Sequence, residues 1–185
     1  MNKKSYKMVA LLGFVLPVLC ASQSFAADVR WKRIVGVISA PDDFSTQADE
    51  HINNPVGNIA SGTFPWSVRS GHARVNLSTG AVSFDVEGLV IVGQVFSGTP
   101  GPITQVVGTL VCNPGEETQA TLDTPARDIS VQGDARFAGT LANIPTTCAS
   151  PLFLIRIASI QLPNTDPDAA DGLWIATGAE RSIRN

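Results

Sequence analysis

Few side chains in this 185-residue sequence can serve acid–base or nucleophilic catalysis. It has two histidines, His51 and His72, and no Gly-x-Ser-x-Gly motif of the kind that presents a serine nucleophile. A zinc site needs about three or four His, Cys or carboxylate ligands, and the sequence has only three cysteines beside those histidines. The sequence therefore argues against a serine triad and a zinc enzyme, and it predicts no catalytic residue.

The chain also lacks an excess of basic charge. It has 13 Lys and Arg residues against 16 Asp and Glu residues, a formal net charge of −3. Lys3, Lys4 and Lys7 stand in the N-terminal segment, so the rest of the chain is more acidic. Nucleic acids and anionic membrane surfaces attract proteins through basic patches. We therefore predict no nucleic-acid partner and, once the N-terminal segment is removed, no membrane partner.

No hydrophobic run is long enough to cross a membrane. The longest, at residues 8–20, is shorter than the roughly 20 residues of a transmembrane helix. It follows a lysine-rich start and precedes Ser24-Phe25-Ala26, a pattern typical of a signal-peptide cleavage site. Residues 1–26 are therefore predicted to be a signal peptide. Residues 27–185 are predicted to form a single exported domain, periplasmic or secreted.

Removal of the signal peptide leaves two cysteines, Cys112 and Cys148. In an exported protein an even pair of cysteines indicates a disulfide, and here only one pairing is possible. Cys20 would be the acylated residue of a lipid-anchored protein, but Leu19 precedes it where such anchors have a small residue. We therefore predict a Cys112–Cys148 disulfide and regard a lipid anchor as the weaker alternative.

Alternation of apolar and polar residues dominates residues 27–185, and Gly and Pro interrupt it often. No stretch longer than about eight residues has the apolar spacing of an amphipathic helix. The pattern predicts an all-β fold, a single antiparallel β-sandwich or open barrel of about eight or nine strands. The expected strands are residues 30–39, 66–77, 82–86 continuing into 89–92, 103–112, 120–123, 128–131, 135–141, 153–160 and 173–177.

Two glycines have specific positions in this pattern. The apolar parity changes at Gly71, within the strand expected at 66–77, which predicts a β-bulge there. Ser78-Thr79-Gly80 follows that strand and predicts a three-residue hairpin loop with Gly80 in the left-handed conformation.

An ordered series of glycine-containing segments runs through residues 71–112. It consists of Gly71-His72-Ala73-Arg74-Val75-Asn76-Leu77, residues 80–86, Gly88-Leu89 and the stretch from Gly101-Pro102-Ile103 to Gly108-Thr109-Leu110. This order resembles that of CHRD (chordin-type) domains, which are extracellular β-domains common in bacterial exported proteins. The resemblance implies an extracellular β-fold.

The same resemblance implies no functional residue. CHRD domains usually have a His-x-His element before the Gly-Pro turn, where this sequence has Val95-Phe96-Ser97. Only the fold class is therefore carried over.

The longest expected break between strands is the loop at residues 42–65. It combines carboxylates, a histidine and aromatic rings, and loops on a rigid scaffold are where binding groups usually lie. We therefore expect this loop to recognise an unknown protein or glycan partner. The candidate residues are Asp42, Asp43, Phe44, Asp49, Glu50, His51 and Phe64.

A second acidic stretch contains Asp166, Asp168 and Asp171. Calcium prefers such hard oxygen ligands, but the spacing departs from that of a calcium loop after Asp168 and no glutamate follows at the expected distance. We therefore expect a solvated turn with at most a weak calcium site, and we predict no cofactor.

A binding or structural module of the cell envelope or extracellular space fits this inventory best, because the scarcity of His, Lys and Tyr leaves few groups for catalysis. The alternative is a secreted, glycosidase-like hydrolase that uses loop carboxylates. It would need an aromatic sugar platform, for which Trp31, Trp66 and Trp174 are the candidates. All three fall in or beside alternating strands, so we predict that they pack in the core.

Overall fold

The computed structural model describes residues 28–38, 54–93, 95–161 and 172–184, and the predicted signal peptide lies outside these ranges. The described residues form strands and no helix, which confirms the predicted all-β fold, and none lies in a helix that could span a bilayer. The strands are β1 (Asp28–Gly36), β2 (Trp66–Ser67), β3 (Ser70–Asn76), β4 (Ala81–Glu87), β5 (Val90–Ile91), β6 (Ile103–Cys112), β7 (Ala120–Asp123), β8 (Arg127–Asp128), β9 (Ala135–Thr140), β10 (Leu152–Ile160) and β11 (Trp174–Arg184).

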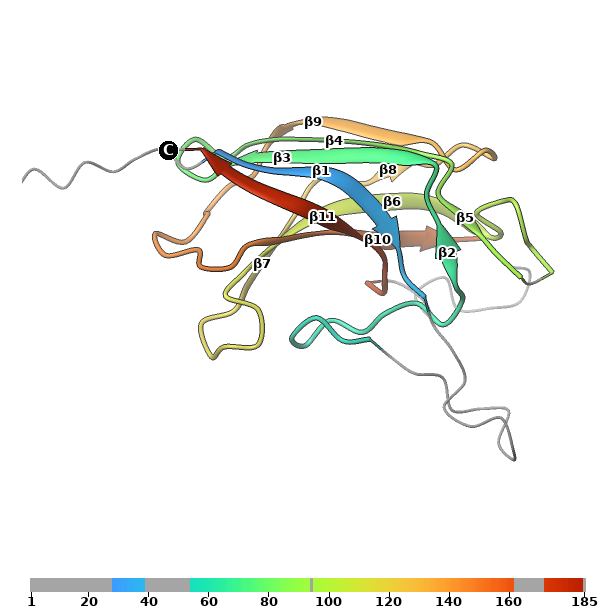
Figure 1. Cartoon of the computed structure of the whole chain (residues 1–185), viewed down its shortest axis with the longest axis horizontal. Coiled ribbons are helices and arrows are strands. Elements are labelled where there is room, and N and C mark those ends of the chain that lie inside the picture. The colour runs from blue at the N-terminus through green and yellow to red at the C-terminus, as the bar shows by residue number, and fades with distance from the viewer. Residues whose placement is uncertain (1–27, 39–53, 94, 162–171, 185) are drawn as a thin grey trace, which may run out of the picture.

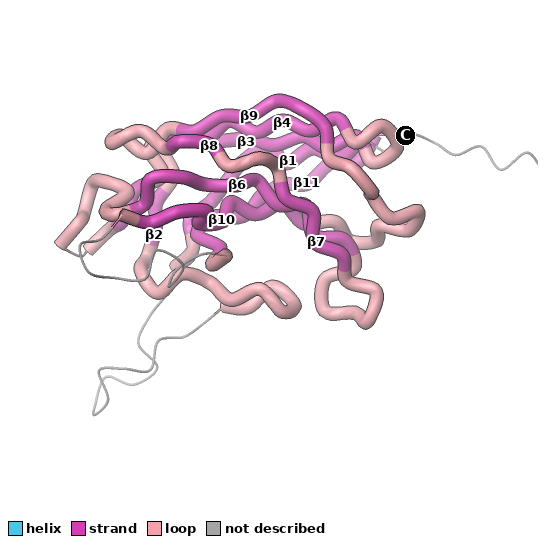
Figure 2. Tube along the Cα trace, turned by 180° about the vertical axis from the view of Figure 1, so that it is seen from behind, coloured by secondary structure: helices cyan, strands magenta, loops and turns pink. Residues whose placement is uncertain are grey.

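Nine of these strands form one antiparallel sheet. Its order is β7-β6-β10-β11-β1-β3-β4-β9, and β8 also pairs with β6. The sheet curls until β8 approaches β9, so that the strands form an open barrel, as predicted (Figures 1 and 2). β2 and β5 form a separate two-stranded sheet at one end, at the right in Figure 1. We call this end the mouth of the barrel.

Four aromatic rings fill the centre of the barrel. Trp31 of β1 lies 5.5 Å from Phe153 of β10, measured between ring centroids, and Phe153 lies 5.9 Å from Phe84 of β4. Phe84 also stacks on Phe137 of β9 at 6.2 Å. These separations are within the favourable range for aromatic pairs. Because β4 and β10 are far apart in the sheet order, the contact between Phe84 and Phe153 crosses the interior and holds the curl.

The predicted core packing of the tryptophans is confirmed. Trp31, Trp66 and Trp174 are all buried. The indole N–H of Trp174 donates a hydrogen bond to the carbonyl of Asn54 at 2.8 Å. Buried tryptophans of this kind stabilise the fold and offer no open platform for a sugar ring.

The strand expected at residues 66–77 is divided in two. β2 belongs to the small sheet and β3 to the barrel, and the chain crosses between them at residues 68–69. β3 pairs with β4 without a register shift across Gly71, so the predicted bulge is wrong. The alternation of apolar residues shifts where the chain crosses from β2 to β3 at residues 68–69. Gly71 instead lets Ile34 pack closely, because an added Cβ would lie 2.9 Å from the Ile34 Cβ.

The continuation of β4 into residues 89–92 was also expected and is wrong. The chain turns at Gly88, which has a φ of 64° and donates its N–H to the Asp134 carboxylate at 2.9 Å. Val90 and Ile91 then form β5 in the small sheet. By contrast, Gly80 has the predicted left-handed conformation, with a φ of 75°.

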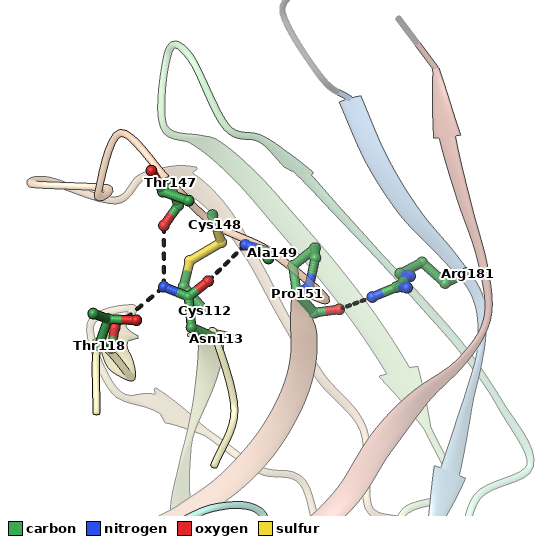
Figure 3. Close-up of a disulfide and its surroundings, with 8 residues drawn as sticks. All are labelled: Cys112, Asn113, Thr118, Thr147, Cys148, Ala149, Pro151 and Arg181. Atoms are coloured by element: carbon green, nitrogen blue, oxygen red, sulfur yellow. Dashed lines mark hydrogen bonds between the residues drawn. A yellow bond between two sulfur atoms is a disulfide. The ribbon is translucent and has the colours of Figure 1, made fainter. Parts of the chain in front are cut away.

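Cys112 and Cys148 form the predicted disulfide, with their Cα atoms 4.7 Å apart. It joins the end of β6 to the segment between β9 and β10, at the end of the barrel opposite the mouth (Figures 1 and 3). A cross-link over 36 residues restricts the unfolded chain and therefore stabilises the fold. A buried disulfide of this kind fits an oxidising compartment.

Asn113 strengthens the same junction. Its side-chain amide donates to the carbonyls of Thr118 and Thr147, both at 3.2 Å, and its side-chain oxygen accepts the N–H of Ala149 at 2.7 Å (Figure 3). The residue has a φ of 52°, a left-handed conformation that asparagine adopts more readily than most residues. One buried side chain therefore ties together two segments that have no strand pairing.

Removal of the disulfide should destabilise the protein without changing its fold. We expect Cys148→Ser to lower the free energy of unfolding by about 2 to 5 kcal/mol, because the unfolded chain regains the entropy of an open loop. Urea unfolding measures the change, with Thr146→Ser as a control in the same segment. Two free thiols in the mass of the unreduced native protein would contradict the cross-link itself.

Gly108 of β6 permits the aromatic contact across the barrel. An added Cβ would lie 2.6 Å from Phe84 Cδ1 and 2.7 Å from Phe153 Cζ, far inside van der Waals contact. We expect Gly108→Ala to lower the free energy of unfolding by about 1 to 3 kcal/mol, as overpacked cores do. In a Phe84→Leu background Gly108→Ala should lower the free energy of unfolding by less, because the ring that it contacts is absent. Strictly additive effects in denaturant unfolding would show that Gly108 and Phe84 are not coupled.

Asp28 of β1 forms ion pairs with two arginines, Arg30 of the same strand and Arg74 of β3. Its carboxylate accepts a hydrogen bond from Arg74 Nε at 2.6 Å and another from Arg30 Nε at 2.9 Å. The hydrogen bond from Arg74 lowers the pKa of Asp28 below its usual value; burial opposes this effect, and Arg30 lowers the pKa further. The carboxylate therefore stabilises the folded state in its ionised form.

This ion pair predicts a pH-dependent stability. Because the folded pKa of Asp28 is below the unfolded value, its contribution is complete above about pH 4 and is lost as the pH falls through the folded pKa. We expect Asp28→Asn to have a lower free energy of unfolding than the native protein at pH 7. The difference in free energy between the two proteins should become smaller below about pH 4. Urea unfolding at both pH values measures it. A difference that stays constant would show that the carboxylate charge has no part in stability.

Candidate functional site

Most of the residues predicted to bind a ligand lie outside the described ranges. This applies to the calcium candidates and to all but one of the recognition candidates, so both hypotheses stay predictions. The residues concerned are Asp42, Asp43, Phe44, Asp49, Glu50, His51, Asp166, Asp168 and Asp171. Phe64 is the recognition candidate that the structure describes.

The described part of the predicted loop, residues 54–65, packs against the start of β11. The N–H of Asn54 donates to the hydroxyl of Ser61 at 3.0 Å, and Ser61 is buried. The backbone N–H of Trp174 donates to the carbonyl of Ala60 at 3.0 Å. These bonds give the segment a defined conformation. Its later part leads to β2 at the mouth, whereas Asn58 contacts Gln119 in the loop between β6 and β7.

Phe64 lines an apolar cavity of about 130 Å³ at the mouth, which we call the mouth cavity. Both sheets contribute to it. Trp66 comes from β2 and Ile91 from β5, while β6 and β10 supply isoleucines. Its lining residues are Gly62, Thr63, Phe64, Trp66, Ile91, Pro102, Ile103, Ile157, Ile160 and Leu173.

Large apolar side chains are exposed around this end of the barrel. Ile38 is 79% exposed and follows β1, beside Asn54, whose side chain donates to the Ile38 carbonyl. Val95 is 89% exposed and Phe96 37%, in the loop between β5 and β6. We call Ile38, Val95 and Phe96 the mouth rim. Phe96 lies beside the cavity-lining Ile91, because both side chains are close to Gly101. An exposed apolar group beside a cavity is typical of an interaction surface.

The chemistry available at the mouth cavity is that of binding. None of the described residues that line it has an ionisable side chain, so this part of the chain offers the cavity no acid, base or charged nucleophile. A dry apolar cavity of about 150 Å³ can bind benzene, so a cavity of this size accommodates one small apolar group. Burial of such a group contributes about 1.5 to 3 kcal/mol.

No pattern in the sequence indicates this cavity. Ile91, Ile160 and Leu173 were expected in strands, and an apolar residue at the end of a strand looks the same whether it lines a cavity or fills a core. Only the curl of the sheet and the added small sheet bring them together. Among the described residues there is no group of three His, Cys, Asp or Glu side chains that could hold a metal ion.

Comparison with known proteins found no matching family model, no matching curated protein and no matching solved structure. The resemblance to CHRD domains therefore rests on the sequence of residues 71–112 and stays a prediction. Any functional argument must come from the geometry of this chain.

Proposed function

We propose that this chain is an exported binding module of the cell envelope or the extracellular space, and that its mouth cavity receives an apolar side chain of a protein partner. The observation that carries the proposal is the mouth cavity, an apolar hollow the size of one side chain with exposed apolar groups beside it. Protein interfaces often owe most of their affinity to one such anchored side chain.

Two features support export. The N-terminal segment has the order of a signal peptide, with lysines, an apolar run and a small-residue cleavage site. The buried disulfide between Cys112 and Cys148 is of the kind that forms and persists in oxidising compartments. The acidic balance of the chain beyond the signal peptide fits a protein with no nucleic-acid partner. Both the periplasm and the extracellular space are consistent with these features.

The chemistry of the mouth favours a protein over a glycan as the partner there. Sugar hydroxyls that enter an apolar cavity lose hydrogen bonds to water and gain none in return, which is costly. The exposed Ile38, Val95 and Phe96 of the mouth rim can instead pack against apolar side chains around a central anchor.

A glycosidase-like activity, the alternative from the sequence, gains no support from the described residues. Such an enzyme needs two carboxyl groups that face each other across a cleft. The carboxylates considered for this role lie outside the described ranges, and no carboxylate is found among the described residues that line the mouth cavity. We therefore propose binding as the function.

A substitution that fills the mouth cavity should remove its binding capacity. Leu173 lines the cavity and is half-buried, so Leu173→Phe adds volume there. Saturating benzene should raise the Tm of the native protein, because a ligand that binds only the folded state stabilises it, and should leave the Tm of Leu173→Phe unchanged. Ile183→Phe is the control, since Ile183 is exposed near the other end of β11.

The same three proteins test the partner. Immobilised native protein and Ile183→Phe should retain the same protein from an envelope extract or culture supernatant, and Leu173→Phe should retain at least about tenfold less, the loss expected from removing one buried anchor. Equal retention by all three would show that the mouth cavity does not anchor the partner. Equal benzene stabilisation of all three would show that the cavity is not a binding site.

A further inference from the structure

The outer face of the barrel carries a row of ionisable side chains across three neighbouring strands. His72 of β3 lies directly opposite Asp85 of β4, and Asp85 lies directly opposite Arg136 of β9. Directly opposite residues of an antiparallel sheet point to the same face, so all three side chains stand side by side. His72 and Arg136 are exposed and Asp85 is half-buried.

A hollow of about 350 Å³ lies over this row, and we call it the outer hollow. The next row on the same face contains Ser83 of β4 opposite Ala138 of β9. These two side chains are short, so the taller His72 and Arg136 stand above them and enclose the space. The volume is within the range of about 300 to 1,000 Å³ that is typical of small-molecule sites.

Arg136 beside the outer hollow differs from the paired arginines of this face. Elsewhere on this face each arginine has a carboxylate partner, as in Arg74 with Asp28 at 2.6 Å and Arg69 with Glu87 at 3.4 Å. Arg136, in contrast, makes no ion pair or side-chain hydrogen bond among the described residues.

A second arginine is fixed at the edge of the outer hollow. The guanidinium carbon of Arg127, from β8, lies 4.9 Å from the centroid of the Phe137 ring, a cation–π contact that restricts its position. Arg127 also lines the outer hollow. Two arginines therefore line the outer hollow, and Asp85 is the only carboxylate among the described residues that line it. In a chain with an excess of acidic residues, this is a local positive site.

We propose that the outer hollow binds an acidic sugar, a sugar ring that carries a carboxylate. The guanidinium groups of Arg127 and Arg136 offer paired N–H donors, which match the two oxygens of a carboxylate. Asp85 can accept hydrogen bonds from sugar hydroxyls, and Ser83 can bond to them as donor or acceptor. A bare inorganic anion would leave Asp85 without a hydrogen-bond donor, and a neutral sugar would leave the arginines without a carboxylate. A uronic-acid unit of a polysaccharide uses both kinds of group.

This site is separate from the mouth cavity, with which it shares no lining residue. It does not rest on the proposed protein partner. Binding of trigalacturonate should therefore be the same in the native protein and in Leu173→Phe, whatever happens to the partner at the mouth.

Isothermal titration of the exported chain with trigalacturonate tests the proposal. We expect saturable binding, and at least about tenfold weaker binding by Arg136→Gln, because loss of one charge-assisted pair removes that much affinity. Arg33→Gln is the matched control, since Arg33 is an exposed arginine of β1 whose carboxylate partner, Glu180, lies away from the outer hollow. It changes the net charge equally and should bind as the native protein does. Equal Tm values would establish that both variants are folded.

Three further results have defined meanings. Maltotriose, which is neutral, should bind at least about tenfold more weakly than trigalacturonate, and equal affinity would overturn the role of the arginines. Inorganic sulfate should not compete with trigalacturonate at equal concentration, and full competition would show that the hollow holds a bare anion. Absence of trigalacturonate binding by the native protein, or an equal loss in Arg33→Gln, would overturn the proposal.

Discussion

The contact between Phe84 and Phe153 crosses the barrel and sets its shape. The two rings come from strands that are far apart in the sheet. Gly108 of β6, the strand beside β10, leaves room for both rings because it has no side chain. Aromatic packing of this kind buries much apolar surface, which outweighs the cost of bending the sheet. Once the sheet is curled, β8 comes close to β9 and the small sheet of β2 and β5 stands at the mouth.

A barrel whose interior is filled by aromatic rings has no room for a ligand between its walls. Binding is therefore left to surfaces that the curl creates at its margins. One is the mouth cavity, where the ends of four strands and the segment containing Phe64 meet without filling the space. The other is the convex face, where a strand register places His72, Asp85 and Arg136 in one row. The rigid core holds both surfaces in position.

Local sequence signals predicted much of the fold because they depend on few residues. The pair Cys112 and Cys148 allowed one disulfide, and Gly80 marked its hairpin. Local signals gave wrong predictions where the pairing of distant strands determines the structure. At residues 68–69, for example, the local sequence does not distinguish a crossing between two sheets from a β-bulge. The row that includes Asp85 depends on two strand registers, and the mouth cavity depends on the curl. Neither could be predicted from alternation alone.

The two ends of the barrel are built differently, and this separates stability from recognition. The end opposite the mouth is fixed by the disulfide and by Asn113, which bonds three backbone groups. The mouth is fixed instead by backbone bonds between residues 54–65 and Trp174, which leave apolar side chains exposed around the cavity. Exposed apolar groups lower solubility and add nothing to the core, so a chain that only needed to fold would gain by making them polar. Val35 and Ile183 are also exposed elsewhere on the barrel. The apolar mouth cavity, with Phe96 beside its lining residue Ile91, is therefore the feature that most strongly favours a binding role.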